Sequence, residues 1–235
     1  MTPKDYKTLS IASHEIMNRL SFIGSAYQYI SARYPESKEF KFWTIMGDSI
    51  GELNTLMKRT SICRHCAFPE KSTISLKQLL DNLRTAPNTC LTTCLHPFDI
   101  VCHCDKDVLI NVDSEQLTIA LCEIIMNGAE ASNFATVYIN VSIQNNDIYI
   151  VISNSGNLPN IQLPQTINQD DNIYYSPDDI NILSEAFYTT KPEHFGLGLY
   201  IANSVISRHN GTLNISQDDK NTYVHIQLHA ICTLT

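Results

Sequence analysis

A seven-residue repeat of apolar side chains opens the chain and constrains its fold more than any other feature. The repeat consists of Leu9, Ile16, Ile23 and Ile30, with Leu20 and Tyr27 between them. Alternating steps of four and three residues are typical of a helix whose apolar seam packs against another helix. Pro35 follows, and proline disfavours the helical conformation in the residue before it. The sequence therefore predicts a helix that ends at Pro35 and needs a helical partner.

That partner is predicted immediately downstream, where a second apolar stripe has similar spacing. The stripe consists of Phe40, Trp43, Met46, Ile50, Leu53 and Met57. Two such helices form an antiparallel hairpin, but a hairpin alone leaves its stripe exposed to water. We therefore expect two copies of the chain to form a homodimer through a four-helix bundle. Pro69 and the polar residues after it mark a linker, which predicts one domain at 1–68 and another at 69–235.

The second predicted domain mixes helices with strands. Strict alternation of apolar and polar residues at 137–143 and 148–152 predicts a β-hairpin with one buried face. Further predicted elements are a helix at 75–84, strands within 97–112, helices at 113–131 and 197–209, and a last hairpin with Val224, Ile226 and Leu228 inward. Asp113 and Gln116 suit a capping box, and Gly211 suits the C-terminal cap of the later helix. The pattern predicts an α+β fold, an α/β sandwich in which helices cover one face of a sheet.

The composition narrows the range of functions. Apolar residues make up 43% and charged residues 17% of the chain, which is typical of an ordered globular protein. The net charge is −8 and no basic cluster lies on a predicted helix face, so we expect no nucleic acid or anionic membrane as partner. Because no apolar run reaches the ~18–20 residues of a membrane span and the N-terminus lacks a signal-peptide core, we expect a cytoplasmic protein with mostly reduced cysteines.

Candidate chemistry begins at His14 in the first helix. If Ile16 and Leu20 face the seam, the His14 imidazole flanks it and is reachable by solvent. Such an imidazole can act as a nucleophile when one ring nitrogen is free and the other is held. Glu15 can hold the tautomer or accept a proton, and Asn18, four residues on, can orient a phosphoryl oxygen or a water. A solvated histidine on an amphipathic helix is the alternative interpretation.

A polar face on the predicted helix at 113–131 is the second candidate. Glu123, Asn127 and Glu130 share this face by their spacing of four and three residues. Asn127 offers a neutral oxygen to Mg²⁺, which prefers oxygen ligands and retains waters, and Glu123 can position one of those waters. An ordinary polar stripe on a half-buried helix is the alternative.

Two glycine-containing segments supply the remaining candidates. Asn154 stands at the end of a predicted strand, where a side chain can meet the edge of an adenine ring, and Gly156 lets the backbone pass close by. Gly196 and Gly198 open the helix at 197–209, so that backbone N–H groups can approach phosphate oxygens at the positive end of the helix dipole. Lys191 can add a positive charge to the same phosphates. Taken singly, each segment is also an ordinary turn.

The order of these segments along the chain resembles that of the two-component sensor histidine kinases. The resembling boxes are His14-Glu15-x-x-Asn18 (phosphoacceptor), Glu123 to Ala131 (asparagine), Asn154-Ser155-Gly156 (first glycine), Phe187 to Lys191 (phenylalanine) and Gly196 to Leu199 (second glycine). The resemblance covers about residues 5–230, nearly the whole chain. The joint order and spacing are far more specific than any single box.

The resemblance implies a function for the whole chain. It implies ATP-dependent autophosphorylation of His14, with ATP and Mg²⁺ as cofactors, and transfer of the phosphoryl group to an aspartate of a response-regulator partner. For the second domain it implies the Bergerat-type ATP-binding fold.

Three positions depart from the family pattern. Asn154 stands where the family usually has Asp, Leu158 where a second glycine is expected, and Arg19 where many members have Pro. An Asn carbonyl still accepts the adenine amino hydrogen, but without the charge. The changes at Asn154 and Leu158 favour an alternative, an ATP-independent phosphorelay histidine phosphotransferase with a degenerate nucleotide site. The intact glycine pair and Lys191 favour the kinase.

A metal or redox sensor is a further alternative. Its candidate residues are Cys63, Cys66, Cys90, Cys94, Cys102 and Cys104, with His65, His96 and His103. The spacing Cys63-x-x-Cys66 indicates zinc only where a second pair lies nearby in space. An ATPase without a histidine substrate is less favoured, because it leaves the N-terminal hairpin unexplained.

Overall fold

The computed structural model divides the chain into two compact units. It describes residues 3–86, 98–104, 107–156, 166–167, 173–175, 177–191 and 194–233. The first unit, here called the hairpin unit, is Met1–His65, and the second, the sheet unit, is Cys66–Thr235. The sequence-based boundary lies at 68/69, just after the turn that follows the last helix of the hairpin unit.

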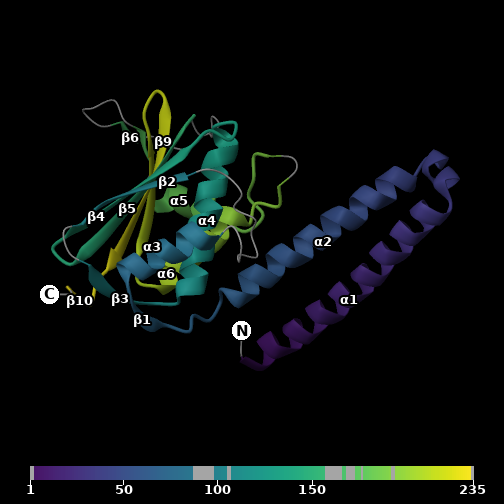
Figure 1. Ribbon diagram of the computed structural model, residues 1–235, viewed down its shortest axis with the longest axis horizontal. Coiled ribbons are helices and arrows are strands. Elements are labelled where there is room, and N and C mark those ends of the chain that lie inside the picture. The colour runs from purple at the N-terminus through teal and green to yellow at the C-terminus, as the bar shows by residue number, and fades with distance from the viewer. Residues whose placement is uncertain are drawn as a thin grey trace. The chain divides into compact units, whose positions relative to one another are not determined.

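The hairpin unit consists of two long helices joined by a short 3₁₀ turn. α1 spans Pro3–Arg33, the 3₁₀ helix Pro35–Glu39, and α2 Trp43–His65 (Figure 1). The predicted stop at Pro35 is confirmed, because α1 ends two residues before it. Near the turn, Trp43 stacks on Tyr27 with ring centroids 4.8 Å apart, and its indole N–H donates to Ser31 Oγ at 2.9 Å. These contacts fix the antiparallel pairing of the two helices.

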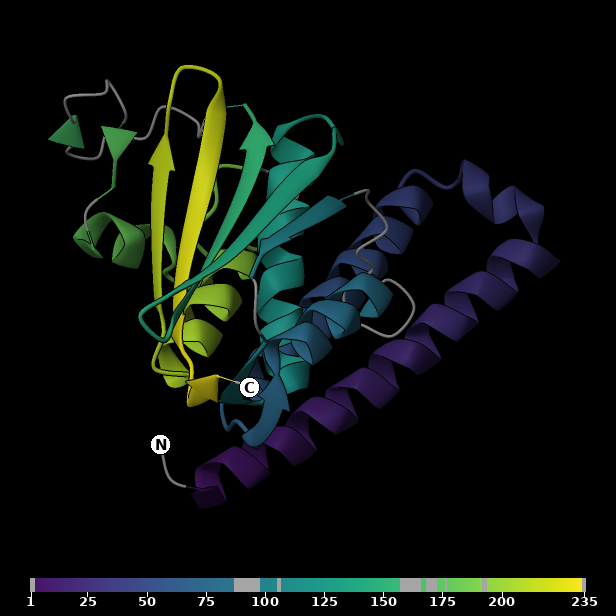
Figure 2. The same cartoon turned by 60° about the vertical axis from the view of Figure 1, so that its left-hand side comes forward.

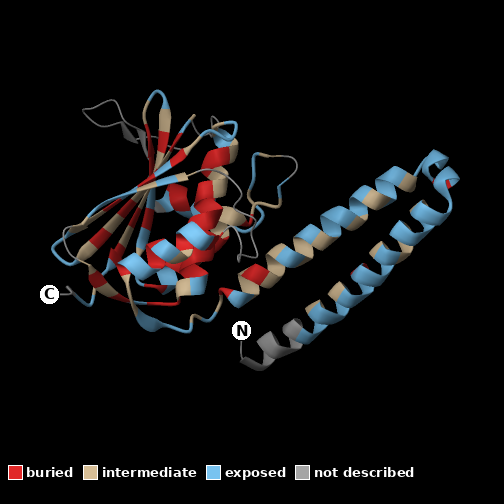
Figure 3. Cartoon of the chain, in the orientation of Figure 1, coloured by how far each residue is buried: buried red, intermediate tan, exposed pale blue. Residues whose placement is uncertain are grey.

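Much of the apolar seam stays exposed within one chain. Leu20 is buried at 8% exposure, but the other seam residues are more open: Ile16 47%, Ile23 48%, Ile30 37%, Met46 42% and Leu53 47%. Figure 3 shows the resulting run of exposed and half-exposed residues along α1 and α2. Pairing of α1 with α2 therefore covers only part of the predicted stripe.

The sheet unit is built on a seven-stranded sheet in the order β2-β4-β5-β9-β8-β7-β6. The strands are β2 Phe98–His103, β4 Val137–Gln144, β5 Asp147–Ser155, β6 Thr166–Ile167, β7 Ile173–Tyr174, β8 Thr212–Gln217 and β9 Asn221–His229. All neighbours pair antiparallel except β2 and β4, which run parallel. Parallel strands need a long crossover, and here β3 and α4 lie between them in the chain. The sheet is thus mixed: β4–β5 and β8–β9 are the predicted antiparallel hairpins, and β2 adds a parallel edge strand.

Helices cover one face of this sheet, as predicted. They are α3 Leu76–Thr85, α4 Ser114–Ala131, α5 Pro177–Leu183 and α6 Gly198–Arg208, and Figure 2 shows α4 and α6 against the sheet. Alternate strand residues point toward the helices and are fully buried, including Val137, Ile139, Ile150 and Ile226. Their neighbours Tyr138 and Asn140 are exposed. The alternation of apolar and polar residues in the sequence therefore corresponds to a sheet with one covered face, and the predicted sandwich is confirmed.

A second, three-stranded sheet was not predicted. It consists of β3 Val108–Val112 between β1 Ser72–Ser75 and β10 Cys232–Thr233, all antiparallel. Its outer strands are short and lack a strong alternation, and they come from opposite ends of the unit.

The helix ends differ in detail from the predicted caps. Asp113 caps α4 by accepting from the backbone N–H of Gln116, but its own N–H donates to His209 Nε2 at 2.9 Å, and the Gln116 amide donates to Phe68 O. At the end of α6 the left-handed residue is Asn210, with φ 57°, while Gly211 N–H donates to Ile206 O in the next position. Gly211 is needed for space, because a Cβ there would lie 2.6 Å from Gln227 O.

Within the described ranges, every helix is too short or too polar to cross a bilayer.

Candidate functional site

The first part of the site is the junction between α4 and the start of α6. Glu123 is buried at 2% exposure and Asn127 is half-buried, on the same face of α4. A Cβ on Gly198 would lie 2.9 Å from Glu123 Oε2 and 3.4 Å from Asn127 Nδ2. Only glycine lets the first turn of α6 approach these two side chains so closely. The structure thus brings together Glu123, Asn127 and Gly198, which the sequence had placed in one site from segments about 70 residues apart.

The residues before α6 turn tightly to aim this helix. Gly196 has φ 62°, and a Cβ there would lie 2.4 Å from Tyr188 O. Phe187, also in the left-handed region at φ 71°, donates its N–H to Gly196 O at 3.1 Å. The N-cap of α6 is Leu197, whose side chain has no acceptor for the first N–H groups of the helix. The start of α6 is therefore suited to an anion that meets these N–H groups at the positive end of the dipole.

Asn154 lies at the end of β5, with its side chain buried at 7% exposure. Its Nδ2 donates to Ser155 O at 2.9 Å, and a Cβ on Gly128 of α4 would lie 3.1 Å from its Oδ1. Asn154 is thus packed against α4 at Gly128, the residue after Asn127. Because Oδ1 is the acceptor that remains, it is the atom that can meet an amino group.

Gly156 sits beside Asn154 and joins β5 to the β8–β9 turn. It has φ 103°, and its N–H donates to Lys220 O at 2.7 Å. The Asp218 carboxylate orders this turn by accepting from Lys220 N–H, the Tyr223 hydroxyl and Asn221 N–H, and these hydrogen bonds lower the pKa of Asp218 to about 2. The turn is therefore held by a permanently charged group at neutral pH.

Thr222 belongs to the same region but was missed by the sequence analysis. It pairs directly with Asn154 across β5 and β9, is buried at 6% exposure, and donates its hydroxyl to Gly156 O at 2.8 Å. Its position depends on strand register, which the local sequence does not reveal. A pocket of about 370 Å³ opens beside Asn154 and is lined by Ala135, Thr136, Tyr138, Ser153, Asn154, Ser155 and Asn221. Because Asn127 and Gly198 are not in its lining, this pocket does not reach the α4–α6 junction.

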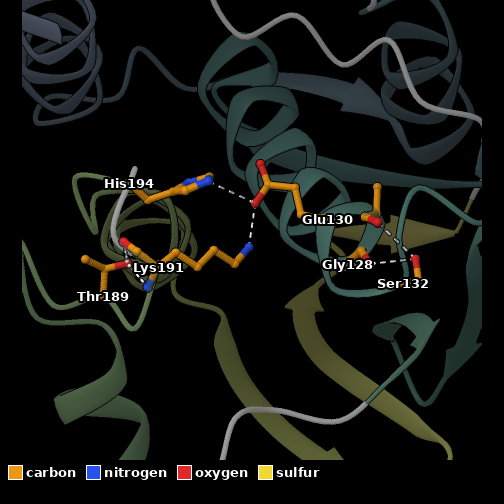
Figure 4. Close-up of polar contacts among 7 residues, drawn as sticks. Gly128, Glu130, Ser132, Thr189, Lys191 and His194 are labelled. Carbon is orange, nitrogen blue, oxygen red and sulfur yellow. Dashed lines mark hydrogen bonds and ion pairs between the residues drawn. The ribbon is translucent and has the colours of Figure 1, made fainter.

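Lys191 is tied to α4 by an ion pair. Its Nζ lies 2.5 Å from Glu130 Oε2, and His194 Nε2 lies 3.6 Å from the same oxygen (Figure 4). Thr189 Oγ1 accepts from the backbone N–H of Lys191 at 3.1 Å. The sequence placed Glu130 on the same helix face as Asn127 but gave it no role, so its contact with Lys191 adds a residue to the candidate site.

The residues predicted for phosphoacceptance lie on α1 in the hairpin unit. His14, Glu15 and Asn18 are all exposed. Glu15 Oε1 pairs with Arg19 Nη2 at 2.9 Å, so in this structure Arg19, where many family members have Pro, engages the carboxylate predicted to serve His14. The roles of these three residues stay predictions.

The metal-sensor alternative gains no support from the described part of the chain. There, no group of three or more His, Cys, Asp and Glu side chains could hold a metal ion. Cys90, Cys94 and His96 lie outside the described residues, as does Leu158.

Two curated proteins match the chain over most of its length. Sporulation kinase C of Bacillus subtilis (strain 168) is 24% identical over 211 residues, 88% of this chain and 44% of that protein. The sensory histidine kinase/phosphatase NtrB of Azospirillum brasilense is 23% identical over 222 residues, 93% of this chain and 54% of that protein. The chain therefore spans about half the length of these two relatives.

Solved structures share the fold. Full-length ShkA in complex with AMPPNP superposes with a TM-score of 0.66 and 14% sequence identity. The superposition covers 100% of this chain and 47% of the ShkA chain. The histidine kinase AdeS of Acinetobacter baumannii superposes with a TM-score of 0.51 and 14% identity, covering 93% of this chain and 98% of its own.

The family assignment follows from the sequence match to the sheet unit. The sequence model of the family described as "Histidine kinase-, DNA gyrase B-, and HSP90-like ATPase" matches residues 112–231, from the end of β3 to the segment after β9. This range contains every candidate residue of the sheet unit, and together with the two relatives it confirms the resemblance to sensor histidine kinases. The chain belongs to the family of histidine kinase-, DNA gyrase B- and HSP90-like ATPases.

Proposed function

We propose that the chain is an ATP-dependent protein-histidine kinase that phosphorylates His14 and passes the phosphoryl group to an aspartate of a response regulator. The observation that carries the proposal is the α4–α6 junction. There the start of α6, whose N-cap Leu197 makes no side-chain hydrogen bond, lies against Glu123 and Asn127, with space that only Gly198 permits. A helix start of this kind binds phosphate, and an amide oxygen beside it suits a phosphate-bound cation.

The residues present fit ATP with Mg²⁺. The backbone N–H groups of Gly196 and Gly198 and the Lys191 ammonium would hold phosphate oxygens. The Asn127 amide oxygen would hold Mg²⁺, which would supply positive charge to the phosphates. Asn154 Oδ1 would accept from the adenine amino group, and Gly156 would let the backbone pass close to the ring.

The transfer step uses His14 as the nucleophile. An imidazole nitrogen forms a bond to the γ-phosphorus while the bond from that phosphorus to the ADP oxygen breaks, with the two in line. Glu15 would stabilise the positive charge on the ring once Arg19 releases it, and Asn18 would orient a phosphoryl oxygen. Since such a transfer depends on positioning and electrostatics, a hairpin unit and a sheet unit must meet during the step and separate afterwards.

The proposed partners are a second copy of the chain and a response regulator. The exposed seam on α1 and α2 is the surface that a homodimer would bury, giving the four-helix bundle. Both curated relatives are named as kinases, one of them a histidine kinase/phosphatase, which supports a phosphoryl-transfer partner of the response-regulator class.

Incubation of the purified chain with γ-labelled ATP and Mg²⁺ tests the proposal. The kinase acquires an acid-labile, base-stable label without any other protein, and then loses it to a response regulator. A chain that takes up no label from ATP but accepts it from a phosphorylated regulator is the ATP-independent phosphotransferase. That alternative is favoured by Asn154, whose amide lacks the charge of the family's Asp.

A further inference from the structure

Glu130 and Lys191 join two parts of the sheet unit that are 61 residues apart in sequence. Glu130 lies in the last turns of α4, and Lys191 lies in the segment between α5 and α6. Figure 4 shows the Lys191 side chain extended toward Glu130, with His194 approaching the same carboxylate from one side. The pair is partly buried, since the side chains of Lys191 and Glu130 are 40% and 22% exposed. A half-buried pair is screened less by salt than a fully exposed one.

The segment that carries Lys191 has little regular structure of its own. Its described residues between α5 and α6 form no helix or strand, and its ends are joined by the hydrogen bond from Phe187 N–H to Gly196 O. The backbone N–H of Lys191 is held only locally, by Thr189 Oγ1. The Glu130 carboxylate contacts two side chains of this segment, Lys191 and His194, and so ties the segment to α4.

Glu130 is also close in position to the phosphate side of the proposed site. It follows Asn127 by three residues and therefore shares its face of α4. A lone carboxylate there would repel phosphate, but an ammonium group on it cancels that charge. A lysine ammonium carries three donors, so one bond to Glu130 leaves others for phosphate oxygens.

We propose that Glu130 is a positioning residue: it holds the Lys191 ammonium beside α4, ready for the triphosphate. The proposal rests on the proposed function, because it assigns Lys191 to ATP. Glu130 acts through Lys191 and does not itself contact the nucleotide. The opposite arrangement, in which Glu130 competes with phosphate for Lys191, would give the opposite effect on affinity.

A double-mutant cycle in the full chain tests this role. The variants are Glu130→Gln, Lys191→Met and the two combined. Asp81→Asn is the matched control, because it removes one carboxylate from an ion pair with Arg84 on α3. Two quantities are measured: the dissociation constant of Mg-ATP by calorimetry, and amide hydrogen exchange of residues 187–196 without nucleotide.

Glu130→Gln is expected to weaken Mg-ATP binding about fivefold when Lys191 is present, the size typical of a partly exposed charged contact. In the Lys191→Met background it should cause no weakening, and Asp81→Asn should leave affinity unchanged. Exchange of residues 187–196 should be faster in both single variants than in the parent, and no faster in the double variant than in either.

Tighter binding in Glu130→Gln would overturn the proposal in favour of competition. Equal weakening with and without Lys191 would also overturn it, since Glu130 would then act independently of Lys191. If the parent chain itself does not bind Mg-ATP, the proposed function fails, and the exchange data alone decide about Glu130. Unchanged exchange in Glu130→Gln would then refute its positioning role.

Discussion

The hairpin unit and the sheet unit bury their apolar residues to different extents. In the sheet unit, Ile139 and Ile150 are fully buried within one chain, whereas Ile23 and Leu53 of the hairpin unit remain nearly half exposed. Both pairs of residues come from regular apolar patterns in the sequence. The sheet unit therefore buries its apolar pattern within one chain, whereas the hairpin unit leaves apolar residues exposed, which the proposed homodimer would bury.

The loss of stability on truncation to alanine should be largest for a core residue of the sheet unit and small for a seam residue of the hairpin unit. Ile150→Ala should destabilise the sheet unit by about 3 kcal/mol, because it leaves a cavity between β5 and the helices. Leu53→Ala should cost the hairpin unit less than about 0.5 kcal/mol in dilute monomer. Urea titrations measure both, with exchange of β5 amides reporting the sheet unit and fluorescence of Trp43, the single tryptophan, reporting the hairpin unit.

Measuring the destabilisation by both variants at several protein concentrations tests whether the seam is a dimer interface. If the seam is a dimer interface, the cost of Leu53→Ala grows with protein concentration, while that of Ile150→Ala does not. A cost of Leu53→Ala that stays the same at all concentrations, with a chain that sediments as a monomer, would refute the proposed homodimer.

A second comparison uses one glycine from each unit. Gly196→Ala should destabilise the sheet unit by about 2 kcal/mol, because alanine is strained at φ 62° and its Cβ would meet Tyr188 O. Gly51→Ala in α2 should stabilise the hairpin unit by about 0.5–1 kcal/mol, since its Cβ has open space and alanine favours helix. The same two probes measure both variants. A neutral Gly196→Ala would show that the turn before α6 tolerates side chains.

The smallest expected effect is a pH dependence confined to the sheet unit. Burial lowers the pKa of His209 below its usual 6.5, because desolvation disfavours the charged ring by more than the hydrogen bond to Val205 O favours it. In the neutral ring, Nε2 accepts from Asp113 N–H and Nδ1 donates to Val205 O. Because the pKa is lower in the folded state, the neutral His209 ring contributes its full stability at a pH above the usual pKa. This contribution is lost as the pH falls through the lowered pKa of the folded state. The stability difference between the parent chain and His209→Gln should therefore shrink from about pH 7.5 to about pH 5. A constant difference over this range would show that His209 does not titrate with folding.

The elements that the sequence predicted well are those with a local periodic signal. The heptad seam predicted α1 and its end at Pro35, and the alternation around residues 137–152 predicted β4, β5 and their covered face. Asp113 predicted the start of α4 because a capping side chain acts within three residues. The predicted approach of the Gly196 and Gly198 backbone to phosphate oxygens stays a prediction; in the structure, a Cβ at these positions would lie 2.4 Å from Tyr188 O and 2.9 Å from Glu123 Oε2.

The features that the sequence did not predict depend on long-range pairing. β1 and β10 are four and two residues long and meet only on β3. The parallel pairing of β2 with β4 needs a long crossover, and no local sequence pattern predicts which strand lies beside β2 after it. Thr222 joins Asn154 only through the register of β5 and β9, and Glu130 meets Lys191 across 61 residues. At the end of α6, Asn210 takes the left-handed position, and Gly211 follows where a Cβ would lie 2.6 Å from Gln227 O of β9.

The most direct test of the kinase account is the fate of label from γ-labelled ATP in His14→Ala. The His14 side chain is exposed on α1, so its removal should leave both units folded. If His14 is the phosphoacceptor, the variant binds Mg-ATP as the parent chain does, by calorimetry, but incorporates no label. Label that persists on the variant, or that maps in the parent chain to a residue other than His14, would contradict it.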